Sequence, residues 1–164
     1  MTAARPVLAS SRGFSLIELL AAAAILGILA TVAVPVLKTT MQRQKEHDLR
    51  IALQDIRRAI DAYKAASAAG RITVPTGASG YPPSLTDLSE GVTDPNAPAG
   101  PKQYFLRRVP RDPFFADRSV AAHATWGLRS FESPPDKPMP GNDVFDVYSL
   151  ADGKGLNGVP YGEW

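Results

Sequence analysis

The segment SLIELLAAAAILGILATVAVPVL, residues 15–37, decides the fold of this chain. From Leu19 to Leu37 it contains no charged residue, and Thr31 is the only hydroxyl in that run. As a helix, these residues would rise about 28 Å, close to the roughly 30 Å thickness of a bilayer's hydrocarbon core. The segment is therefore long enough to cross a membrane.

A short basic flank precedes the apolar segment. Residues 1–13, MTAARPVLASSRG, contain Arg5 and Arg12 and no acidic residue. Positive charge on a short N-terminal flank keeps that flank in the cytoplasm. We therefore expect one membrane span, with the rest of the chain on the outer side of the membrane.

Glu18 lies at the front of the apolar segment, where a carboxylate needs an explanation. An acidic side chain costs about 2.5–3.5 kcal/mol at the centre of a membrane helix, and less near the interface. A cleaved secretory signal leaves Glu18 unexplained and has a shorter apolar region, and a plain single-span anchor leaves it unexplained too. A cut between Gly13 and Phe14 would instead create an amino terminus four residues before Glu18. The α-amino group of a neighbouring subunit could then pair with the carboxylate.

The sequence RGFSLIEL, residues 12–19, resembles the leader motif of type IV prepilins. In that family a short basic leader ends in glycine, phenylalanine follows, and glutamate is the fifth mature residue. The resemblance implies that a prepilin peptidase cuts after Gly13 and N-methylates Phe14. It also implies that Glu18 is the glutamate required for filament assembly, with residues 1–13 as the leader peptide.

Gly27 and Pro35 weaken the predicted helix over residues 14–37. An interior proline removes a backbone hydrogen bond and clashes with the preceding turn. Glycine costs about 1 kcal/mol relative to alanine. Pilins similar to this chain also carry a helix-breaking proline at the position of Pro35. Two interpretations stay open: local melting when subunits move from the bilayer into a filament, and a kink at the membrane edge.

Residues 38–69 are predicted to continue the helix with one apolar face. Spacings of 4, 3, 4 and 3 place the large apolar residues on that face, namely Leu49, Leu53, Ile56, Ile60 and Tyr63. Small side chains widen the stripe at Ala52, Ala59 and Ala66. We expect a solvated or subunit-facing side opposite, formed by Arg50, Asp55, Arg57, Asp61 and Lys64. Gly70 suits a left-handed cap at the end of the helix.

The stripe repeats over too few heptads for a coiled coil, so packing against the chain's own C-terminal domain is favoured. Residues 70–164 are rich in proline and glycine and are predicted to form that domain. A short helix is expected in residues 84–91, with Ser84 as its N-cap and Gly91 as its stop. Strands are expected at 125–131 and 143–150. The predicted fold class is α+β, a long N-terminal membrane-embedded helix packed against a small antiparallel sheet.

Several C-terminal segments are similar to the major (G-type) pseudopilins of type II secretion: residues 80–88, 109–114, 126–130, 143–149 and 152–164. With the leader motif, the similarity touches most of the chain. It implies a structural subunit that polymerises with copies of itself in the inner membrane and periplasm of a Gram-negative bacterium. Such a filament helps push exoproteins through the outer membrane. The implied partners are minor pseudopilins, the inner-membrane assembly platform and the prepilin peptidase.

Two alternatives to this function stay open at this point. One is a type IV pilin that builds a surface fibre for adhesion, motility or DNA uptake. The other is a monomeric single-span binding protein, in which Glu18 would have no role.

The resemblance also implies a calcium site in the last loop, because that loop commonly binds calcium in the G-type family. The oxygens available here belong to Ser149, Asp152 and nearby carbonyls, with Glu163 within reach. Calcium prefers six to eight oxygen ligands and usually more than one carboxylate. The family loop tends to carry a second aspartate before the terminal tryptophan, where this chain has VPYGEW. The alternative is a glycine-rich tail held against the sheet by Tyr161 and Trp164.

Composition excludes several other functions. The 164 residues carry a net charge of +2 with no dense basic run, which argues against a nucleic-acid partner. There is no cysteine, so neither a disulfide framework nor a thiolate nucleophile is available. His47 and His123 lack motif partners, and no phosphate-binding glycine loop is present. We therefore expect a substrate of the prepilin peptidase that is not itself an enzyme and has no cofactor other than the implied calcium.

Overall fold

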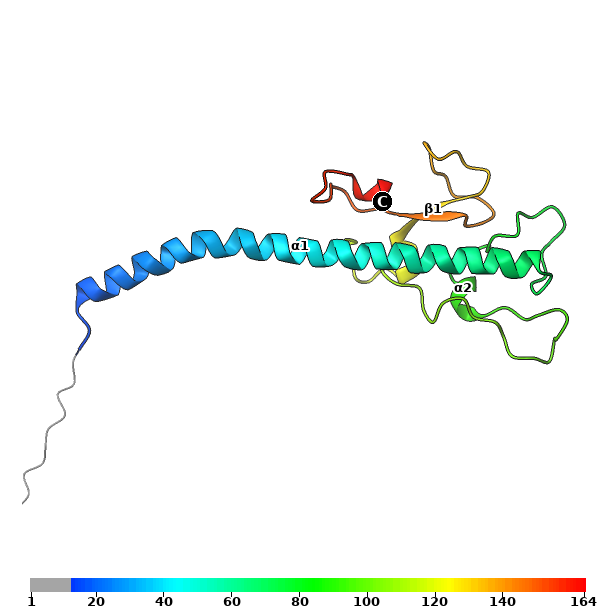
Figure 1. The fold of residues 1–164 in the computed structure, drawn as a ribbon, viewed down its shortest axis with the longest axis horizontal. Helices are drawn as coiled ribbons and strands as arrows, with labels where there is room; N and C mark the ends of the chain where they lie inside the picture. The colour runs from blue at the N-terminus through cyan, green and yellow to red at the C-terminus, as the bar shows by residue number, and fades with distance from the viewer. Residues whose placement is uncertain (1–12) are drawn as a thin grey trace, which may run out of the picture. The chain divides into compact units, whose positions relative to one another are not determined.

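The computed structural model describes residues 13–164, and the fold is drawn in Figure 1. The chain divides after Met41 into two compact units. Helix α1, Leu16–Ala68, begins in the first unit and ends in the second, coloured from blue to green in Figure 1. Its 53 residues correspond to about 80 Å of helix at 1.5 Å per residue. The predicted leader lies outside the described residues except for Gly13.

The first unit, as far as it is described, is the N-terminal part of α1. The helix starts at the carbonyl oxygen of Ser15, which accepts hydrogen bonds from the amides of Glu18 and Leu19 at 3.1 and 3.2 Å. It continues without interruption through Gly27 and Pro35. This part of α1 is long enough and apolar enough to cross a membrane.

The second unit, residues 42–164, contains the hydrophobic core. The predicted stripe of α1 is buried in full: Leu49, Ala52, Leu53, Ile56, Ala59, Ile60, Tyr63 and Ala66. The remainder of the core comes from the segments after the helix: Ile72, Leu85, Leu88, Trp126, Val144, Val147 and Tyr161. The stripe therefore packs against its own C-terminal domain, as the sequence predicts.

The end of α1 shows why the helix stops where it does. The amide of Arg71 donates to the carbonyl of Ala66, and that of Gly70 donates to the carbonyl of Ser67, both at 3.0 Å. This pair of bonds forms a Schellman motif, which requires a left-handed residue after the helix. Gly70 supplies it with a φ of 71°, confirming the predicted cap.

The sheet consists of two short antiparallel strands, β1 (Trp126–Arg129) and β2 (Asp146–Ser149). Trp126 pairs with Ser149, and Arg129 pairs with Asp146. Both strands lie inside the predicted ranges but are shorter, and the proline-rich residues 132–142 connect them to each other. The α+β class is confirmed.

Three short helices complete the second unit: α2 (Asp87–Glu90) and the 3₁₀ turns η1 (Ala122–Thr125) and η2 (Tyr161–Glu163). Gly91 ends α2 with a φ of 80°, as predicted. The predicted N-cap was wrong, because the cap position is occupied by Thr86. Ser84 instead donates to the carboxylate of Asp87 at 2.6 Å.

The predicted charged side of α1 is only partly free. Arg57 and Lys64 are half-buried, because each side chain reaches from α1 to the C-terminal domain. Lys64 donates to the carbonyl of Ser79, and its ammonium lies 4.9 Å from the ring centroid of Tyr81. Asp55 and Asp61 are exposed. The expectation of one uniformly solvated or subunit-facing side was therefore wrong for these two cations.

Candidate functional site

The predicted processing and assembly residues lie at the start of α1. Gly13 is exposed, and the Phe14 side chain retains 78% of its accessible surface. Glu18 lies in the first turn of α1, also exposed. The bond predicted to be cut is thus accessible among the described residues, and the Glu18 side chain is exposed.

The apolar side chains on both sides of Glu18 have no cover among the described residues. Ten large apolar residues between Phe14 and Leu37 each retain half or more of their accessible surface. They belong to Leu16, Ile17, Leu19, Leu20, Ile25, Leu26, Ile28, Leu29, Val34 and Val36. Soluble proteins rarely expose so large a contiguous apolar surface. This surface needs either lipid or other protein chains around it.

Gly27 and Pro35 lie within this exposed surface. A methyl group added at Gly27 would meet nothing within 4 Å, so packing within the described chain does not require glycine there. Pro35 lacks an amide proton and leaves the carbonyl of Thr31 without its helical donor. The Thr39 hydroxyl donates back to the carbonyl of Pro35 at 3.0 Å. Whether the segment melts during assembly stays a prediction.

In the second unit, a buried carboxylate that sequence reasoning missed holds the C-terminal loop. Glu46 is only 4% exposed, and its Oε1 accepts three hydrogen bonds. The donors are the amide of Leu156 at 2.9 Å, the hydroxyl of Tyr161 at 3.2 Å and the side-chain amide of Gln42 at 3.0 Å. Glu46 lies three residues before Leu49, on the same face of α1. That spacing was the available signal, since an acid aligned with a buried stripe must be paired.

Tyr161 is the aromatic centre of this loop. Its ring stacks on Phe114 with centroids 4.2 Å apart and meets the edge of Trp164 at 5.2 Å. Its hydroxyl also accepts a hydrogen bond from Gln42 at 3.1 Å. Burial, with the Glu46 carboxylate beside the hydroxyl, raises the pKa of Tyr161 above its ordinary value of 10.0. The predicted tail anchored by Tyr161 and Trp164 is therefore present, but it is held against α1 and Phe114 in addition to the sheet.

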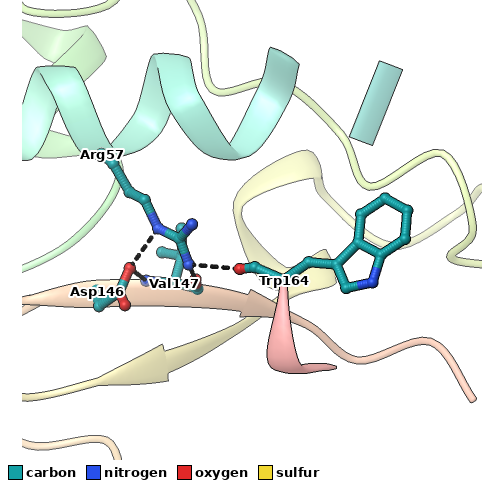
Figure 2. A network of polar contacts seen from close by, with 4 residues as sticks. All are labelled: Arg57, Asp146, Val147 and Trp164. Carbon is teal, nitrogen blue, oxygen red and sulfur yellow. Dashed lines mark hydrogen bonds and ion pairs between the residues drawn. The ribbon is translucent and has the colours of Figure 1, made fainter. Parts of the chain in front are cut away.

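A second link between the loop and α1 is made by Arg57, as Figure 2 shows. Its Nε donates to Asp146 at 2.8 Å, and one terminal nitrogen donates to the main-chain oxygens of Val147 and Trp164 at 3.1 and 2.9 Å. Arg50 lies over the ring of Trp164, 4.3 Å from the centroid. One guanidinium thus ties α1 to β2 and to the C-terminal segment together.

The structure uses the predicted calcium ligands in other ways. Ser149 is buried, and its hydroxyl donates to Asp112 at 2.5 Å and accepts the amide of Ala151 at 3.1 Å. The other oxygen of Asp112 accepts the amide of Phe114 at 2.8 Å. Asp152 is exposed, and residues 13–164 contain no group of three or more acidic, histidine or cysteine side chains placed to hold a metal. This donor set does not fit calcium.

Asp112 is a second residue whose role sequence reasoning missed. It is 1% exposed, and together with Ser149 it connects the turn at residues 109–114 to β2. Its hydrogen bond to Ser149 depends on a tertiary contact between segments 37 residues apart, which no local pattern reveals.

These features define a class of protein, the pilin-like subunits, with an exposed apolar helix joined to a small α+β domain. Residues 8–34 match the family described as "Prokaryotic N-terminal methylation motif". That match covers the predicted cleavage site, Glu18 and most of the apolar helix. No solved structure matches the chain significantly.

Comparison with curated proteins is more specific. The chain is 30% identical to type II secretion system core protein G of Klebsiella michiganensis, covering 82% of this chain and 89% of that protein. It is 31% identical to the protein of the same name from Pectobacterium carotovorum subsp. carotovorum, covering 80% of each. The Dickeya chrysanthemi protein is 28% identical, over 90% and 92% of the two chains. The chain belongs to the family of type II secretion system core protein G, the major pseudopilins. Its role is that of a structural subunit of the type II secretion system.

Proposed function

We propose that this pseudopilin is cut after Gly13, N-methylated at Phe14 and polymerised in the inner membrane to form a pseudopilus that pushes exoproteins outward. The apolar surface of α1 carries this proposal. It is exposed along residues 14–37 and needs lipid before assembly and neighbouring subunits afterwards. Transfer between those two environments keeps the surface out of water throughout.

Glu18 would form an ion pair between subunits during assembly. Its exposed carboxylate lies near the start of the apolar surface and would pair with the α-amino group of a neighbouring mature subunit. An ion pair in lipid or in a dry filament core is far less screened than one in water. Glu18 therefore favours the register in which the amino terminus of the next subunit lies beside it.

The proposed organisation follows from these assignments. Residues 1–13 are the leader, residues 14–37 the membrane and filament-core helix, residues 38–69 its amphipathic continuation, and residues 70–164 a periplasmic domain. The partners are further copies of the chain, minor pseudopilins, the inner-membrane assembly platform and the prepilin peptidase. The apolar span and the methylation motif support anchoring in the inner membrane.

Mass spectrometry of the N-terminal peptide from membrane-extracted protein tests the proposal. We expect a chain that begins at Phe14 and carries one N-methyl group. A chain cut within residues 21–35 would indicate a conventional signal peptide and would contradict the filament proposal. An uncut chain beginning at Met1 would contradict processing and leave Glu18 without a role.

A further inference from the structure

The C-terminal loop, residues 151–164, has an internal framework of backbone hydrogen bonds. Lys154 and Pro160 form a bridge, and the amide of Gly155 donates to the carbonyl of Val159 at 2.8 Å. The amide of Tyr161 donates to the carbonyl of Gly153 at 3.3 Å. These bonds close the loop on itself, but they do not attach it to the rest of the domain.

Besides the Arg57 bond to Trp164, attachment to α1 comes from Glu46, at two separate points of the loop. The carboxylate accepts the amide of Leu156 near the loop tip and the hydroxyl of Tyr161 near its end. Gln42, one helical turn earlier, donates to both Glu46 and Tyr161. The three side chains form a closed set of hydrogen bonds, and this set fixes the loop in two places.

Burial makes this carboxylate a strong anchor. Glu46 has lost almost all contact with water, so its negative charge depends on the donors that the protein provides. Hydrogen bonds to an ionised acceptor are roughly twice as strong as those between neutral groups. Displacing the loop would leave the carboxylate without two of its three donors.

The same loop offers few free oxygen ligands for a divalent cation. Asp152 is exposed, and Lys154 adds a positive charge two residues later. The hydroxyl of Ser149 and both oxygens of Asp112 are already engaged in hydrogen bonds with each other and with nearby amides. Calcium would have to replace these bonds, and from the loop it would gain only the exposed carboxylates of Asp152 and Glu163, which no third acidic, histidine or cysteine side chain joins in the described part of the chain.

We infer that Glu46, held by Gln42 and Tyr161, fixes the C-terminal loop in place of a calcium ion. The subunit then reaches its folded shape without a divalent cation. The inference concerns the single subunit, and only its consequence for filaments rests on the proposed function. Pseudopilus assembly by this chain should therefore continue when calcium is chelated.

The test uses the full chain in detergent micelles, with added calcium chloride or with excess EGTA. We expect the same melting temperature in both, and the same exchange rate of the Leu156 amide with deuterium. Glu46→Ala should lower the melting temperature by about 5–10 °C and accelerate exchange at Leu156 in both solutions. The matched control is Asp48→Ala, which removes an exposed carboxylate two residues away and should change neither quantity.

A second variant keeps the inference testable if Glu46→Ala fails to fold. Asp152→Asn removes the exposed loop carboxylate that the resemblance assigns to calcium, and it should leave the melting temperature unchanged with calcium present. A lower melting temperature in EGTA, or a calcium-dependent loss in Asp152→Asn, would overturn the inference. All these readouts come from unassembled subunits. A failure of the proposed filament function would therefore leave them unaffected and be recognised separately.

Discussion

The two parts of α1 differ in what surrounds their apolar side chains. The large apolar side chains described within residues 14–37 are exposed, whereas the apolar stripe in residues 49–63 is buried by the chain's own C-terminal domain. Ile28 is 68% exposed and Ile56 is 0% exposed, although both belong to the same helix. The first part depends on a second component, and the second part is complete within one chain. Substitutions in the two parts should therefore affect different measurements.

The largest expected effect comes from Glu18 and is confined to assembly. Glu18→Gln removes the charge that would meet a neighbour's amino terminus, so we expect loss of filaments from cells expressing only this variant. The melting temperature of the domain formed by residues 42–164 should not change. Electron microscopy of sheared filaments and thermal unfolding of the purified subunit check the two halves of this prediction. Filaments of normal abundance from the Glu18→Gln variant would contradict the proposed role of Glu18.

The next largest effect is a difference in unfolding free energy between alanine variants of Ile56 and Ile28. Ile56→Ala leaves a cavity in the core and should lower the free energy of unfolding by about 2–5 kcal/mol. Ile28→Ala, the matched control in the exposed part, should leave it unchanged. Denaturant unfolding of both variants in the same detergent measures the difference. Equal destabilisation by the two substitutions would show that residues 14–37 also contribute to the folded domain.

Substitution of Arg57 should cause a smaller loss of folding stability. Arg57→Met removes the hydrogen bonds to Asp146 and to the main-chain oxygens of Val147 and Trp164, costing about 1–3 kcal/mol. The adjacent Arg58 is 75% exposed at its side chain and pairs only loosely with Asp55 at 4.0 Å. Arg58→Met should therefore cost no more than about 1 kcal/mol. Urea unfolding tests the ranking, and a reversed order would contradict the importance of the Arg57 link.

Alkaline pH should lower the folding stability of the domain formed by residues 42–164, which contains the buried part of α1. Burial, with the Asp87 charge, raises the pKa of Tyr63, and burial, with the nearby Glu46 carboxylate, raises the pKa of Tyr161. In the unfolded chain both tyrosine hydroxyls ionise near their ordinary pKa, about pH 10, whereas in the folded chain they ionise at higher pH. The free energy of unfolding is therefore constant below about pH 10 and falls as pH rises through the folded pKa values. Tyr161→Phe should make that fall shallower. Unfolding free energies measured from pH 8 to 11 test this, and an unchanged slope would contradict it.

The smallest effect is expected at Gly27. Gly27→Ala should raise helix stability by about 1 kcal/mol in residues 14–37, because the new methyl group meets no neighbour. The melting temperature of the domain should stay the same. Circular dichroism in detergent measures helix content. The rate of filament formation then distinguishes the two interpretations of this segment, because required melting predicts slower assembly of the variant.

The sequence was most informative where a pattern is local. The apolar run, the stripe from Leu49 to Tyr63, and the cap at Gly70 were all predicted, since helix periodicity and left-handed glycines depend on near neighbours. The boundaries of the two strands were less accurate. The register of a two-stranded sheet depends on partners that are distant in sequence.

The candidate sites divide in the same way. The positions of Gly13, Phe14 and Glu18 follow from a motif of consecutive residues. The roles of Glu46 and Arg57 depend on Leu156, Tyr161 and Trp164, more than a hundred residues further along the chain. The sequence alone predicts a solvated or subunit-facing side for Arg57 and assigns no role to Glu46. Periodicity identifies the face of a helix, but it does not identify what reaches that face.

The shortness of the sheet has a consequence for a chain that must assemble at high local concentration. Each strand has four residues, and the connection between them contains Pro134, Pro135, Pro138 and Pro140. Long, flat strand edges recruit further strands and lead to aggregates, whereas short strands and nearby prolines oppose strand addition. Strand addition between the domains of crowded subunits is therefore disfavoured. Association is left to the exposed apolar part of α1.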